Sequence, residues 1–203
     1  SSPARFAVLD ADLSPEWLAL LSGLGVVLNL WPVPLYYGIH LLLGSVPPIL
    51  ALLLWRTWWA VPMGLLAALQ TWSLWGHPWA VLIFTLEMVW LTVAVRRFNG
   101  PPGREDNGRV VLFSMAFWLL LGCPLVLLTY GVVMGIDPAN VLIAAVKQAF
   151  NGVFNTVLAF GALILRRQEG FTEADGEQLA RVQPALLPAL SRAMQQDPAD
   201  RYP

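Results

Sequence analysis

The sequence predicts an all-α integral membrane protein, a six-span helical bundle with proline-interrupted helices. Two observations lead to this fold class. Of the 203 residues, 57% are hydrophobic and only 12% are charged, which is far from the balance of a soluble domain. The apolar residues also gather in runs of roughly 20, the length that crosses the hydrocarbon core of a bilayer. The chain is therefore expected to have the lipid bilayer as its main surroundings.

The first two predicted spans cover residues 15–31 and 35–55 and are separated by the "WPVP" turn. Pro47 and Pro48 lie inside the second span, where they should bend or interrupt the helix. A broken helix is tolerated in a bilayer only where protein or water satisfies the freed backbone groups. No basic leader precedes the first apolar run, so we expect that run to stay in the membrane.

Four further spans complete the predicted transmembrane domain, which covers residues 15–166. Arg56 and Thr57, the "GHP" turn, the polar stretch 96–109 and the "GIDP" turn separate them. Their expected ranges are 57–75, 79–97, 109–134 and 138–166.

The arginines of the spanning region fall on one side of this predicted bundle. Arg56 follows the second span, four arginines lie between the fourth and fifth spans, and Arg166 and Arg167 follow the sixth. Basic residues concentrate in cytoplasmic loops. We therefore expect residues 1–14 to be a cytoplasmic N-terminal segment, the C-terminal tail to be cytoplasmic, and the turns before residues 35, 79 and 138 to face outward.

Residues 167–203 predict a cytoplasmic helical tail. Thr172 is placed to cap a helix, and Pro184 and Pro188 are expected to divide the tail into two short helices. Apolar residues recur at helical spacing, at Leu179, Val182, Leu186, Leu190 and Met194. Two interpretations stay open: a helix lying on the membrane or against the bundle, and a docking surface for another membrane or cytoplasmic protein.

Two ionisable residues have similar predicted depths in the membrane. At about 1.5 Å per helical residue, Glu87 lies roughly 12 Å inward on the fourth span and Lys147 roughly 14 Å inward on the sixth. A charge within a span costs about 2.5–3.5 kcal/mol on insertion scales. We therefore expect Glu87 and Lys147 to pair, either directly or through a bound polar ligand.

Uncharged polar residues of several spans extend this pair into a predicted pocket. Asn140, Lys147, Asn151 and Asn155 form one stripe of the sixth span. The polar residues of the other spans lie mostly in the outer half of the bundle. The predicted ligand-binding set is Asn29, Tyr36, His40, Gln70, His77, Glu87, Lys147, Gln148, Asn151 and Asn155.

Structural roles are the alternative for each of these residues. Asparagine, glutamine and histidine in membrane bundles often only join neighbouring helices by hydrogen bonds, and Glu87 with Lys147 could only fix packing. His40 could cap backbone groups, and His77 could serve the turn before Pro78. Either histidine could instead bind a pigment.

Other function classes find less support in the sequence. The net charge of -1 provides no basic surface for nucleic acid. Cys123 is the one cysteine, so it indicates core packing or a kink beside Pro124 rather than a disulfide. No nucleophile, carboxylate pair or metal-ligand motif with a recognised spacing occurs. We expect no enzymatic activity, no catalytic residues and no metal site, and no cofactor is indicated.

Three segments, taken in order, resemble a known membrane domain: "LNLWPVPLYYGIHLLLGS" (28–45), "WGHPWAVLIFTLEMVW" (75–90) and "KQAFNGVFNTVLA" (147–159). They resemble the multi-span input domain at the amino terminus of bacterial sensor histidine kinases and diguanylate cyclases. That domain is in turn similar to the six-helix substrate-binding components of vitamin-uptake transporters. The resemblance covers about residues 15–166 and implies a location in the bacterial cytoplasmic (inner) membrane. Its recurring polar and turn positions are Asn29, Pro32, Pro34, Tyr36, Gly38, Gly76, His77, Pro78, Glu87, Lys147, Gln148, Asn151, Gly152 and Asn155.

The residues after Arg167 depart from the signalling proteins. They contain no "GGDEF"-like run, phosphoacceptor helix or nucleotide-binding loop. The leading hypothesis is a non-enzymatic membrane sensor or binding module that takes a small ligand from the outer side into a polar pocket between helices. An accessory structural subunit of a larger membrane complex and a substrate-binding transporter component are the alternatives.

Overall fold

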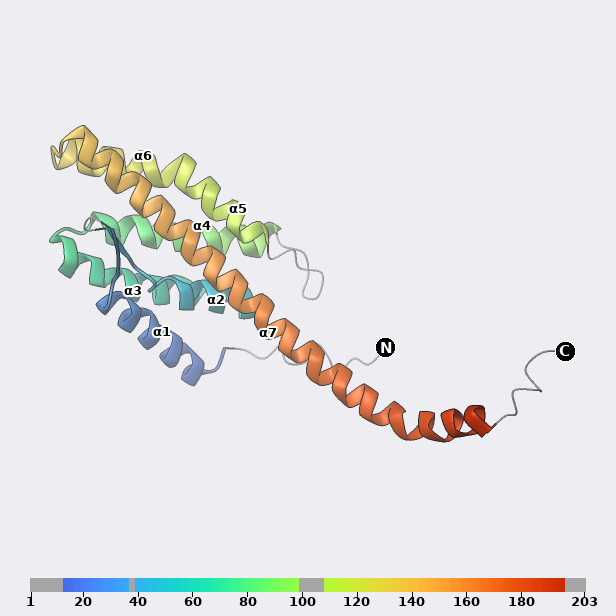
Figure 1. Cartoon of the computed structure of the whole chain (residues 1–203). Helices are drawn as coiled ribbons and strands as arrows, with labels where there is room; N and C mark the ends of the chain where they lie inside the picture. The colour runs from blue at the N-terminus through green and yellow to red at the C-terminus, as the bar shows by residue number, and fades with distance from the viewer. Residues whose placement is uncertain (1–12, 37–38, 99–107, 196–203) are drawn as a thin grey trace. The chain divides into compact units, whose positions relative to one another are not determined.

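The computed structural model describes residues 13–36, 39–98 and 108–195; within these ranges, residues 35–36, 39 and 167–195 are described as backbone only. The chain divides into two compact units, Ser1–Leu163 and Ile164–Pro203. The first unit contains the elements from α1 to the first part of α7, and it holds every site discussed below (Figure 1).

Helix α1, Pro15–Leu30, begins with a standard helix N-cap. The Ser14 hydroxyl accepts a hydrogen bond from the Trp17 amide at 3.4 Å, and Pro15 occupies the first helical turn. An antiparallel hairpin follows, with strands β1, Val33–Tyr36, and β2, Ile39–Leu41. Helix α2 is short, Val46–Trp55.

The predicted second span, 35–55, is therefore wrong as a single helix. Pro32 and Pro34 fix their own φ and disfavour helical backbone before them, which suits extended chain. Pro47 and Pro48 do not bend a helix but begin one, in the first turn, where a missing amide hydrogen costs little. Tyr36 and His40 consequently do not share a helical face; in the hairpin, His40 is opposite Pro34.

Helices α3, Ala60–Trp75, and α4, Trp79–Phe98, form the centre of the first unit. Gly76 ends α3 in the left-handed conformation, with φ 71°, and its amide donates to the Trp72 carbonyl. At the opposite end of α4, the Arg56 guanidinium donates to the Val95 carbonyl at 2.6 Å. This bond joins the end of α2 to the end of α4.

The stretch from residue 109 to residue 133 is helical throughout but changes its winding. It consists of α5, Arg109–Phe117, the π-helical turn η2, Trp118–Gly122, α6, Cys123–Val126, and the π-helical stretch η3, Leu127–Val133. Pro124 has no amide hydrogen to donate to the preceding turn, and η2 ends two residues before it, at Gly122. Such wider turns reorient side chains within an otherwise regular helix.

Helix α7 runs Pro138–Gln195. The Asp137 carboxylate accepts from the amides of Ala139 and Asn140 at its start. The helix continues past Thr172, Pro184 and Pro188, so the predicted cap at Thr172 and the division into two helices are wrong. A helix that is already formed needs no new nucleus to continue past a proline, although each proline removes one backbone hydrogen bond.

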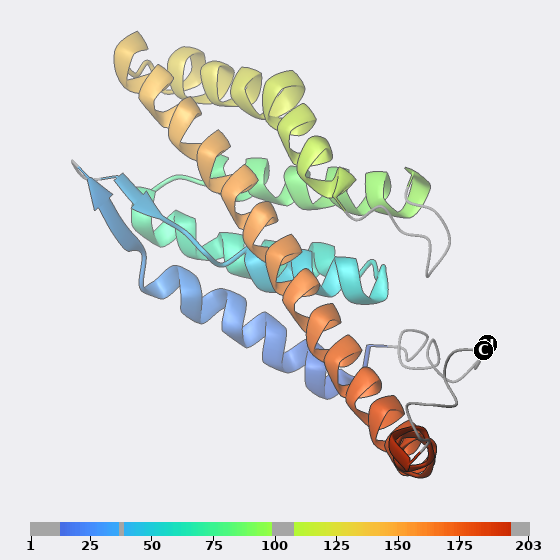
Figure 2. The same cartoon turned by 45° about the vertical axis from the view of Figure 1, so that its right-hand side comes forward.

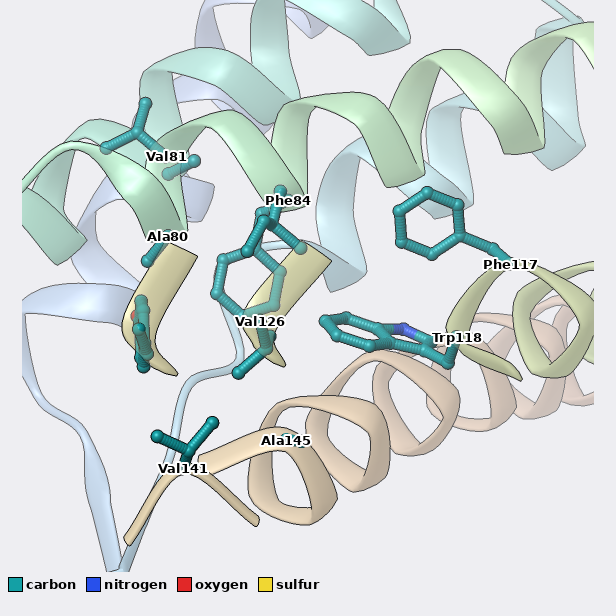
Figure 3. Packing of buried hydrophobic residues seen from close by; sticks show 11 residues of the cluster. Ala80, Val81, Phe84, Phe117, Trp118, Val126, Val141 and Ala145 are labelled. Carbon is teal, nitrogen blue, oxygen red and sulfur yellow. The ribbon is translucent and has the colours of Figure 1, made fainter. Parts of the chain in front are cut away.

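The helices of the first unit lie in the order α1, α3, α4, α5 across the bundle (Figures 1 and 2). A buried aromatic cluster around Phe84, Phe117 and Trp118 packs between α4, η2 and the first part of α7 (Figure 3). Large apolar side chains cover much of the outside, such as Leu119 at 72% exposed. This surface is typical of helices that contact lipid.

Among the described residues, three helical stretches are long and apolar enough to cross a membrane: Trp79–Phe98, Arg109–Val133 and Pro138–Arg166. Helices α1 and α2 are apolar but shorter. The mostly helical character predicted from the sequence is thus confirmed, and three of the described helical stretches could each cross a membrane. The count of six full-length spans is not confirmed, because residues 33–36 and 39–45 are not helical.

The contact between α1 and the segment before α2 gives a matched pair of substitutions. A Cβ at Gly25 would lie 2.9 Å from the Gly44 carbonyl oxygen, whereas a Cβ at Gly23 would meet no atom within 4 Å. Gly25→Ala should lower the free energy of unfolding by about 1–3 kcal/mol through overpacking. Gly23→Ala should raise it by up to about 1 kcal/mol through helix propensity. Equilibrium unfolding in detergent measures both, and equal effects would contradict this close approach.

Candidate functional site

Glu87 is enclosed by hydrogen-bond donors from the neighbouring helix. Its side chain is 1% exposed. Oε1 accepts a hydrogen bond from the Ser114 hydroxyl at 3.0 Å and another from Trp118 Nε1 at 2.8 Å. Two donors compensate part of the cost of burying a carboxyl group in an apolar bundle. The acid thereby ties α4 to α5 and to the π-helical turn η2.

Gly152 of α7 makes room for this arrangement. A Cβ at this position would lie 2.6 Å from Glu87 Oε1 and would overlap the Trp118 indole. The backbone of α7 therefore passes directly over the Glu87–Trp118 hydrogen bond. Glu87 is at the level of Gly152, which lies five residues, or about 7.5 Å of helix, beyond Lys147.

The predicted direct pairing of Glu87 with Lys147 is wrong. No ion pair joins these two residues, both of which lie in the described part of the chain. The Lys147 ammonium instead lies 5.5 Å from the centre of the Trp75 ring, in a cation–π contact. The depth counted from the turns assumes straight, parallel helices, and in the structure Glu87 lies level with Gly152 instead of Lys147.

The asparagines hold the unwound segment, residues 42–45, between the hairpin and α2. Asn151 pairs with Leu42 in both directions: its Oδ1 accepts from the Leu42 amide at 2.7 Å, and its Nδ2 donates to the Leu42 carbonyl at 3.0 Å. Asn155 donates to the same carbonyl and to the Ser45 hydroxyl. From the other side, Asn29 accepts from the Gly44 amide at 2.7 Å and donates to the Ala67 carbonyl.

These contacts give Asn29, Asn151 and Asn155 a structural role. A non-helical segment inside a membrane bundle has backbone groups that water cannot reach, and each must be paired by protein. Asn29 and Asn151 also line a cavity of about 20 Å³ beneath the segment, together with Ser45 and Thr71. That volume accommodates about one water molecule, so this cavity is too small for an organic ligand.

A larger cavity lies at the end of the first unit where α3 leads into α4 and η3 leads into α7. Its volume is about 500 Å³, within the range of small-molecule sites. We call it the Lys147 cavity. Its lining residues are Leu74, Trp75, His77, Tyr130, Met134, Ile136, Asn140, Ala144, Lys147 and Gln148.

The Lys147 cavity combines aromatic rings with a few polar atoms. The rings of His77 and Tyr130 meet edge to face at 4.9 Å, and Trp75 stacks near His77 at 6.5 Å. Gln148 Nε2 donates to the Tyr130 hydroxyl at 2.9 Å. Gln148 Oε1 and His77 Nδ1 are buried without a hydrogen-bond partner. Burial lowers the pKa of His77, which favours its neutral form, so Lys147 is the formal charge of the cavity lining.

Seven of the ten residues in the predicted set therefore separate into three groups. His77, Lys147 and Gln148 line the Lys147 cavity, Asn29, Asn151 and Asn155 hold the unwound segment, and Glu87 is enclosed at the α4–α5 contact. Gln70 is half-buried on α3 and His40 is exposed on β2; neither lines a cavity described above. The side chain of Tyr36 lies outside the described part of the chain.

Sequence reasoning missed the aromatic partners. Trp75, Trp118 and Tyr130 resemble the interfacial aromatic residues of any membrane protein. Only Trp118 carried a usable signal, because it lies nine residues into its span instead of at an end. In the described ranges, no group of three or more histidine, cysteine, aspartate or glutamate residues gathers to bind a metal.

Comparisons with known proteins identify the fold. No protein-family model matches the chain, and no curated protein sequence matches it. Among solved structures, the S component of a bacterial ECF transporter is similar, with a TM-score of 0.54 and 17% sequence identity. The match covers 77% of this chain and 95% of the transporter component. It supports the transporter part of the predicted resemblance and provides no support for the sensor part.

The surroundings of Glu87 predict the outcome of two double-mutant cycles. Glu87→Met and Trp118→Phe remove the same hydrogen bond, so their stability losses should differ from a sum by about 0.5–3 kcal/mol. The stability losses of Glu87→Met and Lys147→Met should add to within about 0.3–0.5 kcal/mol in the double variant, because the two side chains do not meet. Equilibrium unfolding in detergent gives both couplings. A coupling in the second cycle as large as in the first would show that Glu87 and Lys147 interact after all.

The two asparagines that bracket Lys147 on α7 should differ in their effect on folding. Asn151→Leu leaves the buried Leu42 amide without its partner and should lower the free energy of unfolding by about 1–3 kcal/mol. Asn140 is exposed, so Asn140→Leu should change it by less than about 0.5 kcal/mol. Thermal unfolding in detergent tests the pair. Unchanged stability of the Asn151 variant would contradict the structural role.

Proposed function

We propose that this protein is the substrate-binding component of a membrane transporter and that its ligand occupies the Lys147 cavity. The observation that supports this most is a cavity of about 500 Å³ with convergent polar groups, in a fold shared with a transporter S component. Ligand sites are concave, largely apolar and equipped with a few placed polar atoms. The chain acts by binding and has no catalytic role in this proposal.

The proposed route of the ligand is from the outer side of the bacterial inner membrane. The turns 76–78 and 135–137 lie at one end of the first unit, beside the Lys147 cavity (Figures 1 and 2). Arg56 and Arg96 lie at the opposite end, where α2 and α4 terminate. Arginines favour the cytoplasmic side, so we place the cavity at the outer face and both termini in the cytoplasm.

A substrate-binding component of a transporter acts together with other subunits, so we also propose that this chain has a membrane-protein partner. Residues 167–203 remain the candidate segment for this contact, because their apolar series at helical spacing is suited to a protein surface. This assignment follows from the sequence pattern.

Filling the cavity tests the proposed function. Ala144 lines the Lys147 cavity, whereas Val146, two residues further on α7, is 62% exposed on the outside. Ala144→Trp should abolish ligand retention while the protein remains folded, and Val146→Trp should retain it. Mild purification of the three proteins, followed by mass spectrometry of the bound small molecules, measures this. Identical small molecules in all three samples would remove the Lys147 cavity as the binding site.

A further inference from the structure

The Lys147 cavity presents a positive charge, and no acid is among the residues that line it. Lys147 is the one lysine of the sequence and is half-buried. No carboxylate is part of the cavity lining, and within the described ranges no ion pair joins Lys147 to an acid. The Trp75 ring offers only a cation–π contact at 5.5 Å. A cation at membrane depth is expensive unless it meets a compensating charge, so the cavity favours an anion.

The walls of the cavity favour a flat ring beside that anion. Trp75 at the end of α3, His77 in the turn that follows and Tyr130 in η3 give the cavity lining three aromatic side chains. Aromatic rings pack well in offset or edge-to-face geometry against another planar group. An aliphatic chain of the same size would gain apolar contact but not these ring interactions.

Two buried acceptors of the cavity lining lack a donor. Gln148 is 4% exposed. Its Nε2 donates to the Tyr130 hydroxyl, and its Oε1 has no hydrogen-bond partner. His77 Nδ1 is likewise buried and unpartnered, and neutral histidine can accept through one ring nitrogen. Buried polar atoms are almost always paired. A ligand N–H or O–H group would supply the missing donor.

On the basis of the proposed function, we propose that the ligand is a small organic anion built on a flat ring that carries an N–H or O–H donor. The anionic group binds the Lys147 ammonium, the ring lies among Trp75, His77 and Tyr130, and the donor meets Gln148 Oε1. The volume of about 500 Å³ fits a molecule of one or two rings.

Because Lys147 is the only lysine, its amine is a built-in reporter of cavity occupancy. Trinitrobenzenesulfonate, an aromatic anion that modifies amines, is added to the purified full-length protein in detergent. Peptide mass spectrometry then separates labelling of Lys147 from labelling of the N-terminal amine. Four probes compete with the reagent: indole-3-acetate, 1-methylindole-3-acetate without the N–H donor, neutral indole-3-acetamide and cationic tryptamine.

Indole-3-acetate should slow the labelling of Lys147, by about tenfold at ten times its Kd, since occupancy follows mass action. Loss of the N–H donor should weaken protection about three- to tenfold. The amide and the amine should protect least. In thermal unfolding, Lys147→Arg should keep the stabilisation by indole-3-acetate, and Lys147→Met should lose it while remaining folded.

The outcomes separate the proposed ligand class from the proposed function of ligand binding in the Lys147 cavity. Protection by tryptamine or indole-3-acetamide equal to that by indole-3-acetate would overturn the anionic class and leave the proposed function standing. Rapid labelling that none of the four probes slows would also overturn the ligand class, and the Ala144→Trp comparison would then decide the proposed function. Lys147 that stays unlabelled in the folded protein and reacts only after denaturation would show a closed cavity and overturn both.

Discussion

The fold depends on pairing the backbone of the unwound segment, residues 42–45, inside an apolar bundle. Non-helical backbone at membrane depth has no water to bond, and each unpaired group costs several kcal/mol. Asn151 and Asn155 from α7 and Asn29 from α1 supply the missing partners, so one short stretch joins helices far apart in the sequence. On the same stretch, Gly25 of α1 passes close to the Gly44 carbonyl, and the first turn of α2 contains two prolines, which have no amide hydrogen to pair.

The two charged residues of the spans meet the cost of burial in different ways. Glu87 receives two hydrogen bonds from side chains that the helix α5 and the turn η2 present, and Gly152 lets α7 close over them. Lys147 receives only an aromatic face and borders a cavity. A buried polar group with all its hydrogen-bond partners stabilises the bundle. A buried group that lacks a partner can receive one from a ligand. This contrast moves the candidate site from the predicted pair to Lys147 alone.

Changes in helical winding position two aromatic side chains of the interior, one that donates a hydrogen bond and one that accepts one. Trp118 begins the π-helical turn η2 and reaches Glu87, while Tyr130 lies in η3 and reaches Gln148 and His77. A regular α-helix through Pro124 would rotate these two rings relative to each other, because a π turn has more residues per turn. The Lys147 cavity and the Glu87 contact are therefore linked through one irregular helix. Neither winding change has a sequence signal beyond the proline itself.

Composition and the lengths of apolar runs determined the mostly helical class and the presence of helices that could cross a membrane, because the bilayer imposes a length and a polarity that any spanning segment must meet. The sequence also determined that Lys147 and Gln148 were unusual, since polar residues are costly in spans wherever they point. Only the tertiary structure decided which of them face one another. Helix rotation, the π-helical turns and the pairing of β1 with β2 depend on packing between segments, and periodicity along one segment contains no information about its neighbours. For that reason the expected single pocket is replaced by three separate features: asparagines that pair the backbone of residues 42–45, an enclosed Glu87, and the Lys147 cavity.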